Sequence, residues 1–220
     1  MPANAKSERR VRAFFDLDCA LLNTHALMDP IVDDLVFCDF PQEAILDARN
    51  RAVELGYTFE LHLKLLGVPE EKISERARFY YEFLNDRGNQ LLYPGVPALI
   101  ERLFQRGIPC ELVTSGVPEF QIAKFKGLTR ISSYFTACHF LWKGAPKANT
   151  IRARLLEGER GVFTDDSTCW LDHPLLERLT RVRMMWPQNP EARPHPKDGV
   201  DWQVARSAEE LEQIIIDLSS

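Results

Sequence analysis

The sequence predicts an α/β protein with a parallel sheet and a helical segment inserted after the first strand. From residue 94 onward, short apolar runs alternate with helical patterns, and this alternation is typical of parallel sheets with right-handed crossovers. An apolar run over 11–15 indicates a buried strand near the N-terminus. Residues 25–92 carry long helical patterns without a convincing strand. We therefore expect a Rossmann-like, three-layer core with a helical cap.

The first half of the chain supplies the first strand and the cap. Helical periodicity covers Pro41 to Leu55, Phe59 to Leu66 and Glu70 to Leu84. We expect residues 25–92 to form the cap, and residues 1–24 and 93–220 to form the core.

The second half of the chain alternates regularly. Leu99, Ile100 and Leu103 recur at helical spacing after Pro94-Gly95, and Ser207 with Glu210 has the spacing of a capping box for a closing helix. We expect helices over 118–125 and 148–156, and a surface loop over 187–199. The expected strands cover 110–114, 135–142, 161–164, 182–186 and 202–205.

Composition and charge exclude several classes of protein. The chain has 220 residues, a net charge of -5 and no long basic stripe, which argues against nucleic acid as the main partner. No apolar run approaches the ~20 residues that span a bilayer, and no secretory signal is evident. The five cysteines include no C-x-x-C pair, so we expect neither zinc nor disulfides, and a cytoplasmic location.

Two carboxylates, Asp16 and Asp18, directly follow the first predicted strand. Open α/β sheets bind ligands at the carboxyl ends of their strands. Acids this close repel each other unless a cation or a shared proton lies between them. An isolated D-x-D is usually only an acidic turn. Here the position also suits a magnesium site with one nucleophilic and one proton-transferring carboxylate.

Three further features lie at the ends of predicted elements. Thr114-Ser115-Gly116 closes a strand and can offer a hydroxyl and backbone N–H groups to a phosphate. Lys147 opens a helix after Gly144-Ala145-Pro146 and can neutralise an anion there. Asp165-Asp166 ends the strand over 161–164 and supplies plausible ligands for a hard cation.

In this order, the motifs resemble those of the haloacid dehalogenase-like hydrolase superfamily. The segment Phe14-Phe15-Asp16-Leu17-Asp18-Cys19-Ala20-Leu21-Leu22-Asn23-Thr24 resembles that family's F-D-L-D-G-T-L-L-D-T. Tyr93-Pro94-Gly95-Val96 resembles the family's Y-P-G-V stretch. The segment from Arg106 to Gly116 resembles the family's R-G-I-P-x-x-x-V-T-S-G stretch. The similarity extends over roughly residues 11 to 186.

The resemblance implies a role for each matching residue. Asp16 would be the nucleophile that forms an aspartyl-phosphate, and Asp18 the acid and base that protonates the leaving oxygen and activates water. Thr114 would bind the phosphoryl group with Ser115 and Gly116, and Lys147 would offset its charge. Mg²⁺ would lie between Asp16, the backbone carbonyl of Asp18, and Asp165 or Asp166.

Two positions are less certain within this resemblance. Lys143 fits an alternative K-x-x-P pattern with Pro146, although we favour Lys147 as the site lysine. Cys19 and Ala20 stand where the family usually has Gly and Thr, and the lost hydroxyl would lower the rate or the metal affinity.

The expected function is a magnesium-dependent phosphatase acting on a small phosphorylated metabolite, as a monomer or homodimer. Asp18 favours phosphate chemistry over the dehalogenase branch of the family. A sugar phosphomutase and a non-catalytic, ligand-binding or regulatory protein of the same fold are the alternatives. Substrate contacts are expected from the cap, where the polar and aromatic candidates are His25, His62, Arg76, Arg78, Tyr80 and Tyr81.

Overall fold

The computed structural model describes residues 10–171 and 178–219, so residues 1–9 of the predicted core lie outside the described part. Within it, six strands form one sheet in the order β3-β2-β1-β4-β5-β6, and every neighbouring pair is parallel. The predicted α/β fold with a parallel sheet is confirmed. The strands are β1 (Val11–Phe15), β2 (Cys110–Gly116), β3 (Phe135–Trp142), β4 (Arg160–Asp165), β5 (Leu179–Met184) and β6 (Gln203–Ala205).

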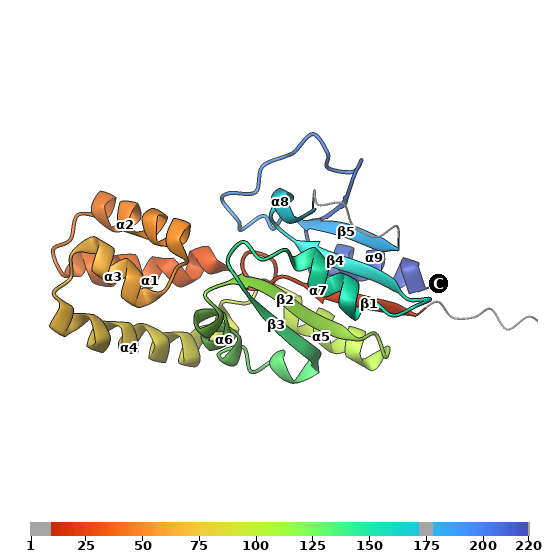
Figure 1. The fold of residues 1–220 in the computed structure, drawn as a ribbon, viewed down its shortest axis with the longest axis horizontal. Coiled ribbons are helices and arrows are strands. Elements are labelled where there is room, and N and C mark those ends of the chain that lie inside the picture. The colour runs from red at the N-terminus through yellow and green to blue at the C-terminus, as the bar shows by residue number, and fades with distance from the viewer. Residues whose placement is uncertain (1–9, 172–177, 220) are drawn as a thin grey trace, which may run out of the picture.

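Strand β1 lies inside the sheet between β2 and β4, and both of its faces are buried. Phe15 packs in a core with α5 (Val96–Gln105) and α9 (Ala208–Ser219) on one face. Phe14 packs on the other face with α7 (Lys147–Arg154) and α8 (Thr168–Leu171). These two cores make the three layers predicted from the sequence, with the sheet between helices (Figure 1).

Helices α1 to α4 lie beyond the carboxyl end of β1, to one side of the sheet (Figure 1). This is the helical insertion after the first strand; its boundaries at residues 25 and 92 stay a prediction. The periodicity identifies α2, α3 and α4 but not α1, which carries Pro30 inside it. The four are α1 (Thr24–Phe37), α2 (Gln42–Leu55), α3 (Phe59–Leu66) and α4 (Glu70–Arg87), and α6 (Pro118–Lys126) packs between α4 and the sheet.

None of the helices in the described ranges is both long enough and apolar enough to cross a bilayer.

Helix α1 ends in a tight left-handed turn. The N–H of Phe40 donates to the carbonyl of Leu35, and the N–H of Asp39 donates to the carbonyl of Val36. This pair of bonds requires a left-handed residue at Asp39, whose φ is 66°. Glycine adopts that conformation without steric cost, whereas an exposed aspartate is strained there and also opposes the helix dipole.

We expect Asp39→Gly to raise the free energy of unfolding by about 0.5–1 kcal/mol, because the left-handed strain removed exceeds the extra chain entropy of glycine. Denaturant unfolding measures the change. Asp33→Gly, at an exposed position inside the same helix, is the control and should destabilise the protein. A loss of stability in Asp39→Gly would contradict this account of the turn.

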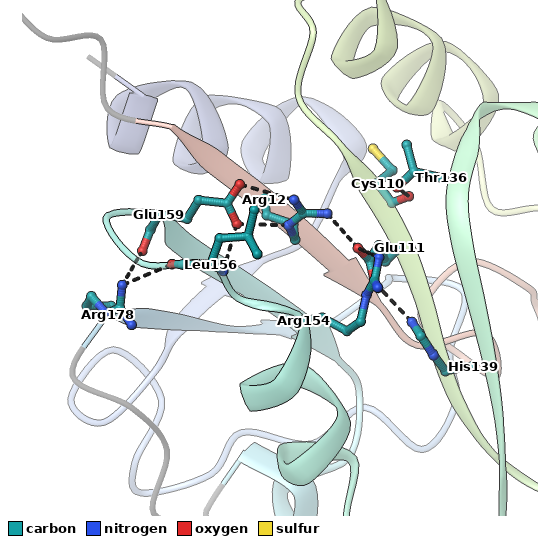
Figure 2. Close-up of polar contacts among 9 residues, drawn as sticks. All are labelled: Arg12, Cys110, Glu111, Thr136, His139, Arg154, Leu156, Glu159 and Arg178. Atoms are coloured by element: carbon teal, nitrogen blue, oxygen red, sulfur yellow. Dashed lines mark hydrogen bonds and ion pairs between the residues drawn. The ribbon is translucent and has the colours of Figure 1, made fainter.

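An ionic network is centred on the buried Glu111, in the amino-terminal half of β2 (Figure 2). Arg12 of β1 donates to Glu111 at 2.6 Å and to Glu159 at 3.0 Å. His139 of β3 lies 3.0 Å from Glu111, and Arg154 of α7 donates to it at 2.9 Å. The network ties three strands and one helix together.

The Glu111 carboxylate is fully buried and surrounded by cations. Burial on its own would raise the pKa of Glu111, but hydrogen bonds from Arg154, His139 and Arg12 outweigh it and lower that pKa. Because the pKa is lower in the folded than in the unfolded chain, the stabilisation is present above the ordinary pKa of glutamate. It is lost as the pH falls through the pKa of the folded state.

We expect Glu111→Gln to lower the free energy of unfolding at pH 7 by about 3 kcal/mol, because the arginines that contact Glu111 then lose a carboxylate partner. The loss should shrink as the pH falls below the ordinary pKa of glutamate, because the unfolded wild-type chain then takes up a proton at Glu111 that the folded protein does not bind. Urea unfolding at pH 7 and below this pKa measures both effects. Glu157→Gln, at an exposed position, is the control, and an equal loss at every pH would contradict the electrostatic explanation.

Candidate active site

Three neighbouring strands carry polar side chains at their carboxyl ends, which lie along the same edge of the sheet. Asp16 directly follows β1, Thr114 lies near the end of β2, and Asp165 ends β4. These strands are adjacent in the order β2-β1-β4, and Phe15 pairs in register with Thr164 and with Leu112. The strand ends therefore bring together side chains that are far apart in the sequence.

Lys147, at the start of α7, lies inside this group of acids. Its Nζ is 2.8 Å from Oδ1 of Asp16 and 2.7 Å from Oδ2 of Asp165, and the residue is 2% exposed. Burial alone would lower the pKa of Lys147, but the charges of Asp16 and Asp165 outweigh it and raise that pKa. The lysine is therefore a permanent cation between two carboxylates.

Lys143 occupies a different place. Its ammonium donates to the backbone carbonyl of Val53 at 2.6 Å and to that of Glu54, both at the end of α2. A cation there complements the negative end of the helix dipole. Lys143 thus connects the β3–α7 loop to the helical insertion, while Lys147 lies among the acids.

Asp16, Asp165 and Asp166 form a cluster that can hold a metal ion, with one ligand atom of each lying within 4.8 Å of the others. Burial and mutual repulsion raise the pKa of Asp165 and of Asp166. When all three carboxylates are ionised, they and the ammonium of Lys147 leave two negative charges in a buried setting. A divalent cation with oxygen ligands would balance that charge, so the residues fit Mg²⁺.

Thr114 places a hydroxyl at this edge of the sheet. It is fully buried, and its Oγ1 has no hydrogen-bond partner among the described residues. A buried hydroxyl without a partner is costly unless a ligand satisfies it. Ser115 and Gly116 follow at the end of β2, where the carbonyl of Gly116 accepts from the backbone N–H of Lys143 at 2.9 Å.

Asp18 is held by three side-chain donors. Its oxygens accept from the Lys124 ammonium at 2.5 Å, from Gln121 at 2.9 Å and from the Thr24 hydroxyl at 2.8 Å. Burial would raise the pKa of Asp18, but Lys124 in particular outweighs it, and the pKa is lowered. In this arrangement Asp18 is a carboxylate.

Gln121 and Lys124 are site residues that the sequence reasoning missed. Both are buried on α6 between Phe120 and Phe125, so polar side chains stand on the apolar face of that helix. Polar residues at i and i+3 on such a face, directly after the Thr114-Ser115-Gly116 turn, are the signal that could have identified them. A Cβ at Gly116 would collide with the Gln121 amide, so glycine makes room for this contact.

Cys19 and Ala20, in the loop after β1, stand where the family that the sequence resembles usually has Gly and Thr. Cys19 has a φ of 56°, the left-handed conformation that glycine adopts readily. Burial and the neighbouring acids raise the pKa of its thiol, so it stays protonated and unreactive. Ala20 supplies no hydroxyl, but Thr24 contacts Asp18 directly, and the Trp186 indole donates to the Ala20 carbonyl at 2.8 Å.

A cavity of about 610 Å³ separates the sheet edge from α1 and α2. Asp18, Ser115 and Ser167 line it on the side of the acids, and His25 and Arg49 line it on the side of the helices. Of the substrate-contact candidates in the cap, only His25 is in this lining. His62 instead binds the carbonyl of Ile45 at 3.0 Å, and Arg76 and Tyr80 bind Asp34.

No protein-family model matches the chain. A phosphoserine phosphatase of Thermus thermophilus is 30% identical over 138 residues, which cover 57% of this chain and 55% of that protein. The match thus spans about half the length of this relative.

Solved structures match nearly the whole chain. A haloacid dehalogenase-like hydrolase of Burkholderia xenovorans LB400 is similar with a TM-score of 0.66 at 19% identity, covering 96% of this chain and 98% of the other. A HAD-hydrolase of Bacillus subtilis bound to magnesium has a TM-score of 0.56 at 21% identity, covering 94% and 99%. The chain therefore shares the fold of these haloacid dehalogenase-like hydrolases.

We expect Mg²⁺ to raise the melting temperature of the wild-type protein by about 5–10 °C at a hundredfold excess over its Kd. Asp166→Asn should abolish this rise, because it removes one ligand of the cluster. The same change should leave the metal-free protein as stable or more stable, since it relieves repulsion among buried acids. Thermal unfolding with and without Mg²⁺ measures both.

Asp86→Asn, at an exposed position, is the control and should respond to Mg²⁺ like the wild type. An unchanged Mg²⁺ effect in Asp166→Asn would show that the ion binds elsewhere.

Proposed function

We propose that the protein is a magnesium-dependent phosphatase that hydrolyses a small phosphate monoester through a phosphorylated Asp16. The observation that carries this proposal is the charge of the site. Three carboxylates share one ammonium beside the unpartnered hydroxyl of Thr114, an arrangement among the described residues that suits one divalent cation and one phosphoryl group.

In the first half of the reaction, a carboxylate oxygen of Asp16 attacks phosphorus. The bond between phosphorus and the leaving oxygen breaks, and that oxygen takes a proton from the acid form of Asp18, a form that the Lys124 contact disfavours, so this contact must be released for the step. Thr114 donates a hydrogen bond to the transferring group, and Lys147 offsets its negative charge while keeping Asp16 ionised. Lys147 contacts one oxygen of Asp16 and one of Asp165, and Asp16 is the candidate nucleophile because it stands first in the D-x-D motif that follows β1.

In the second half, Asp18 as a carboxylate takes a proton from water, which attacks the phosphorylated Asp16. Phosphate leaves, and the Asp16 carboxylate is restored. Lys124, Gln121 and Thr24 support this step, because their three contacts favour the ionised form of Asp18. These residues also fix the direction in which the carboxylate points.

Asp16, Asp165, Asp166 and the backbone carbonyl of Asp18 are the proposed ligands of Mg²⁺. When bound, the ion reduces the repulsion between an anionic nucleophile and an anionic substrate. The ligand types and the excess negative charge of the cluster support this assignment.

We expect Asp16→Asn to reduce Mg²⁺-dependent phosphate release to background, because an amide cannot act as the nucleophile. Asp18→Asn should lower kcat by about 10² to 10⁴, the usual contribution of a general acid and base. Phosphate release from p-nitrophenyl phosphate and a panel of phosphorylated metabolites is the assay, with EDTA and Asp86→Asn as controls.

Other outcomes would identify the alternatives. Turnover only with a bisphosphate activator would indicate a phosphomutase. Halide release from a 2-haloacid without Mg²⁺ would indicate a dehalogenase. Phosphate release that survives in Asp16→Asn would overturn the proposed nucleophile.

A further inference from the structure

The cavity beside the acids has two sides of different character. Near the sheet it reaches Asp18, Ser115 and Ser167, which flank the proposed phosphoryl site. On the side of the helical insertion it is lined by Arg49 of α2. A volume of about 610 Å³ lies within the usual range for small-molecule sites, so the space exceeds what a phosphate group alone would fill.

The other walls are apolar. They comprise Leu27, Met28, Val53, Tyr57 and Phe120. The Tyr57 hydroxyl already contacts His62 at 3.1 Å and Met28 at 3.4 Å, so this residue offers its ring to the cavity rather than a hydrogen bond. The rings of Tyr57 and Phe120 lie 5.4 Å apart at an angle of 59°, and both line the cavity. Such a lining favours an apolar, ring-bearing ligand.

Arg49 brings an uncompensated positive charge to the insertion side of the cavity. Among the described residues it has no carboxylate partner, and its nearest polar contact is the Asn50 side chain at 3.5 Å. The two lysines that line the cavity already have partners, because Lys124 contacts Asp18 and Lys143 contacts backbone carbonyls at the end of α2. A half-buried guanidinium in a cavity binds a carboxylate well, since the two can form parallel hydrogen bonds.

His25 adds a second polar group to the lining. Its Nε2 is buried without a hydrogen-bond partner among the described residues, and the nearest carboxylate oxygen, on the largely exposed Glu191, is 4.0 Å away. A ligand with polar atoms beside its apolar body would satisfy this nitrogen.

Building on the phosphatase function proposed above, we propose that the substrate is the phosphate monoester of an aromatic hydroxy acid. Its phosphate faces Asp16, its ring lies against Tyr57 and Phe120, and its carboxylate binds Arg49. Phosphoserine could place its carboxylate near Arg49, but its short polar body would leave Tyr57 and Phe120 uncovered.

Two matched pairs of compounds test the proposal. Phenyl phosphate and 4-carboxyphenyl phosphate differ only in the carboxylate, and kcat/KM is measured for both. We expect the wild type to prefer the carboxylate by about tenfold to a hundredfold, the usual contribution of a hydrogen-bonded charge. Arg49→Gln should remove this preference by lowering kcat/KM for 4-carboxyphenyl phosphate to the value for phenyl phosphate. Arg51→Gln, on the exposed side of the same helix, should keep it.

The second pair separates binding from catalysis. Benzylphosphonate and 4-(phosphonomethyl)benzoate cannot be hydrolysed, and calorimetry in the presence of Mg²⁺ gives their Kd. If the wild type binds 4-(phosphonomethyl)benzoate more tightly than benzylphosphonate and Arg49→Gln abolishes this difference, the substrate class is supported. If neither phosphate ester is hydrolysed in that case, only the catalytic proposal is overturned. Hydrolysis of phenyl phosphate without any carboxylate preference in either pair overturns the substrate class and leaves the phosphatase proposal standing. A preference that persists in Arg49→Gln overturns the assignment of Arg49.

Discussion

The ammonium of Lys147 holds Asp16 and Asp165 together at the centre of the sheet edge. Two buried carboxylates at the ends of adjacent strands would repel each other, and the lysine at the start of α7 offsets part of that repulsion. It does so incompletely, because Asp166 adds a further acid. The remaining negative charge makes this edge suitable for a divalent cation and an anionic substrate.

The charged groups at the two ends of the central strands are paired to different degrees. At the carboxyl end, the acids of the metal cluster outnumber the lysine that lies among them. Toward the amino end, Arg12, Arg154 and His139 converge on Glu111, which lies on the same strand as Thr114 (Figure 2). The Glu111 network is saturated with partners and serves the fold. The carboxyl end has polar groups without a partner among the described residues and can serve chemistry.

The helical insertion takes part in the site through contacts with the core. Thr24, at the start of α1, and Lys124 of α6 meet on Asp18, so the loop after β1 is held from both sides. Lys143 links the β3–α7 loop to the last carbonyls of α2. The insertion also carries Arg49 and Tyr57, which line the cavity opposite the sheet. The wall formed by the insertion is therefore basic and aromatic, whereas the wall near the sheet carries acids and hydroxyls.

The sequence by itself determined the order of the strands, most of the helices, and the strand ends at which Asp16, Thr114 and Asp165 lie, because apolar runs and turn residues are local signals. Parallel strands in one sheet then place those ends along one edge. The tertiary structure alone decided which lysine reaches the acids, since Lys143 and Lys147 flank the same turn. It also decided that Lys124 pairs with Asp18 and that Arg49 reaches the cavity, because these depend on packing between elements distant in the chain.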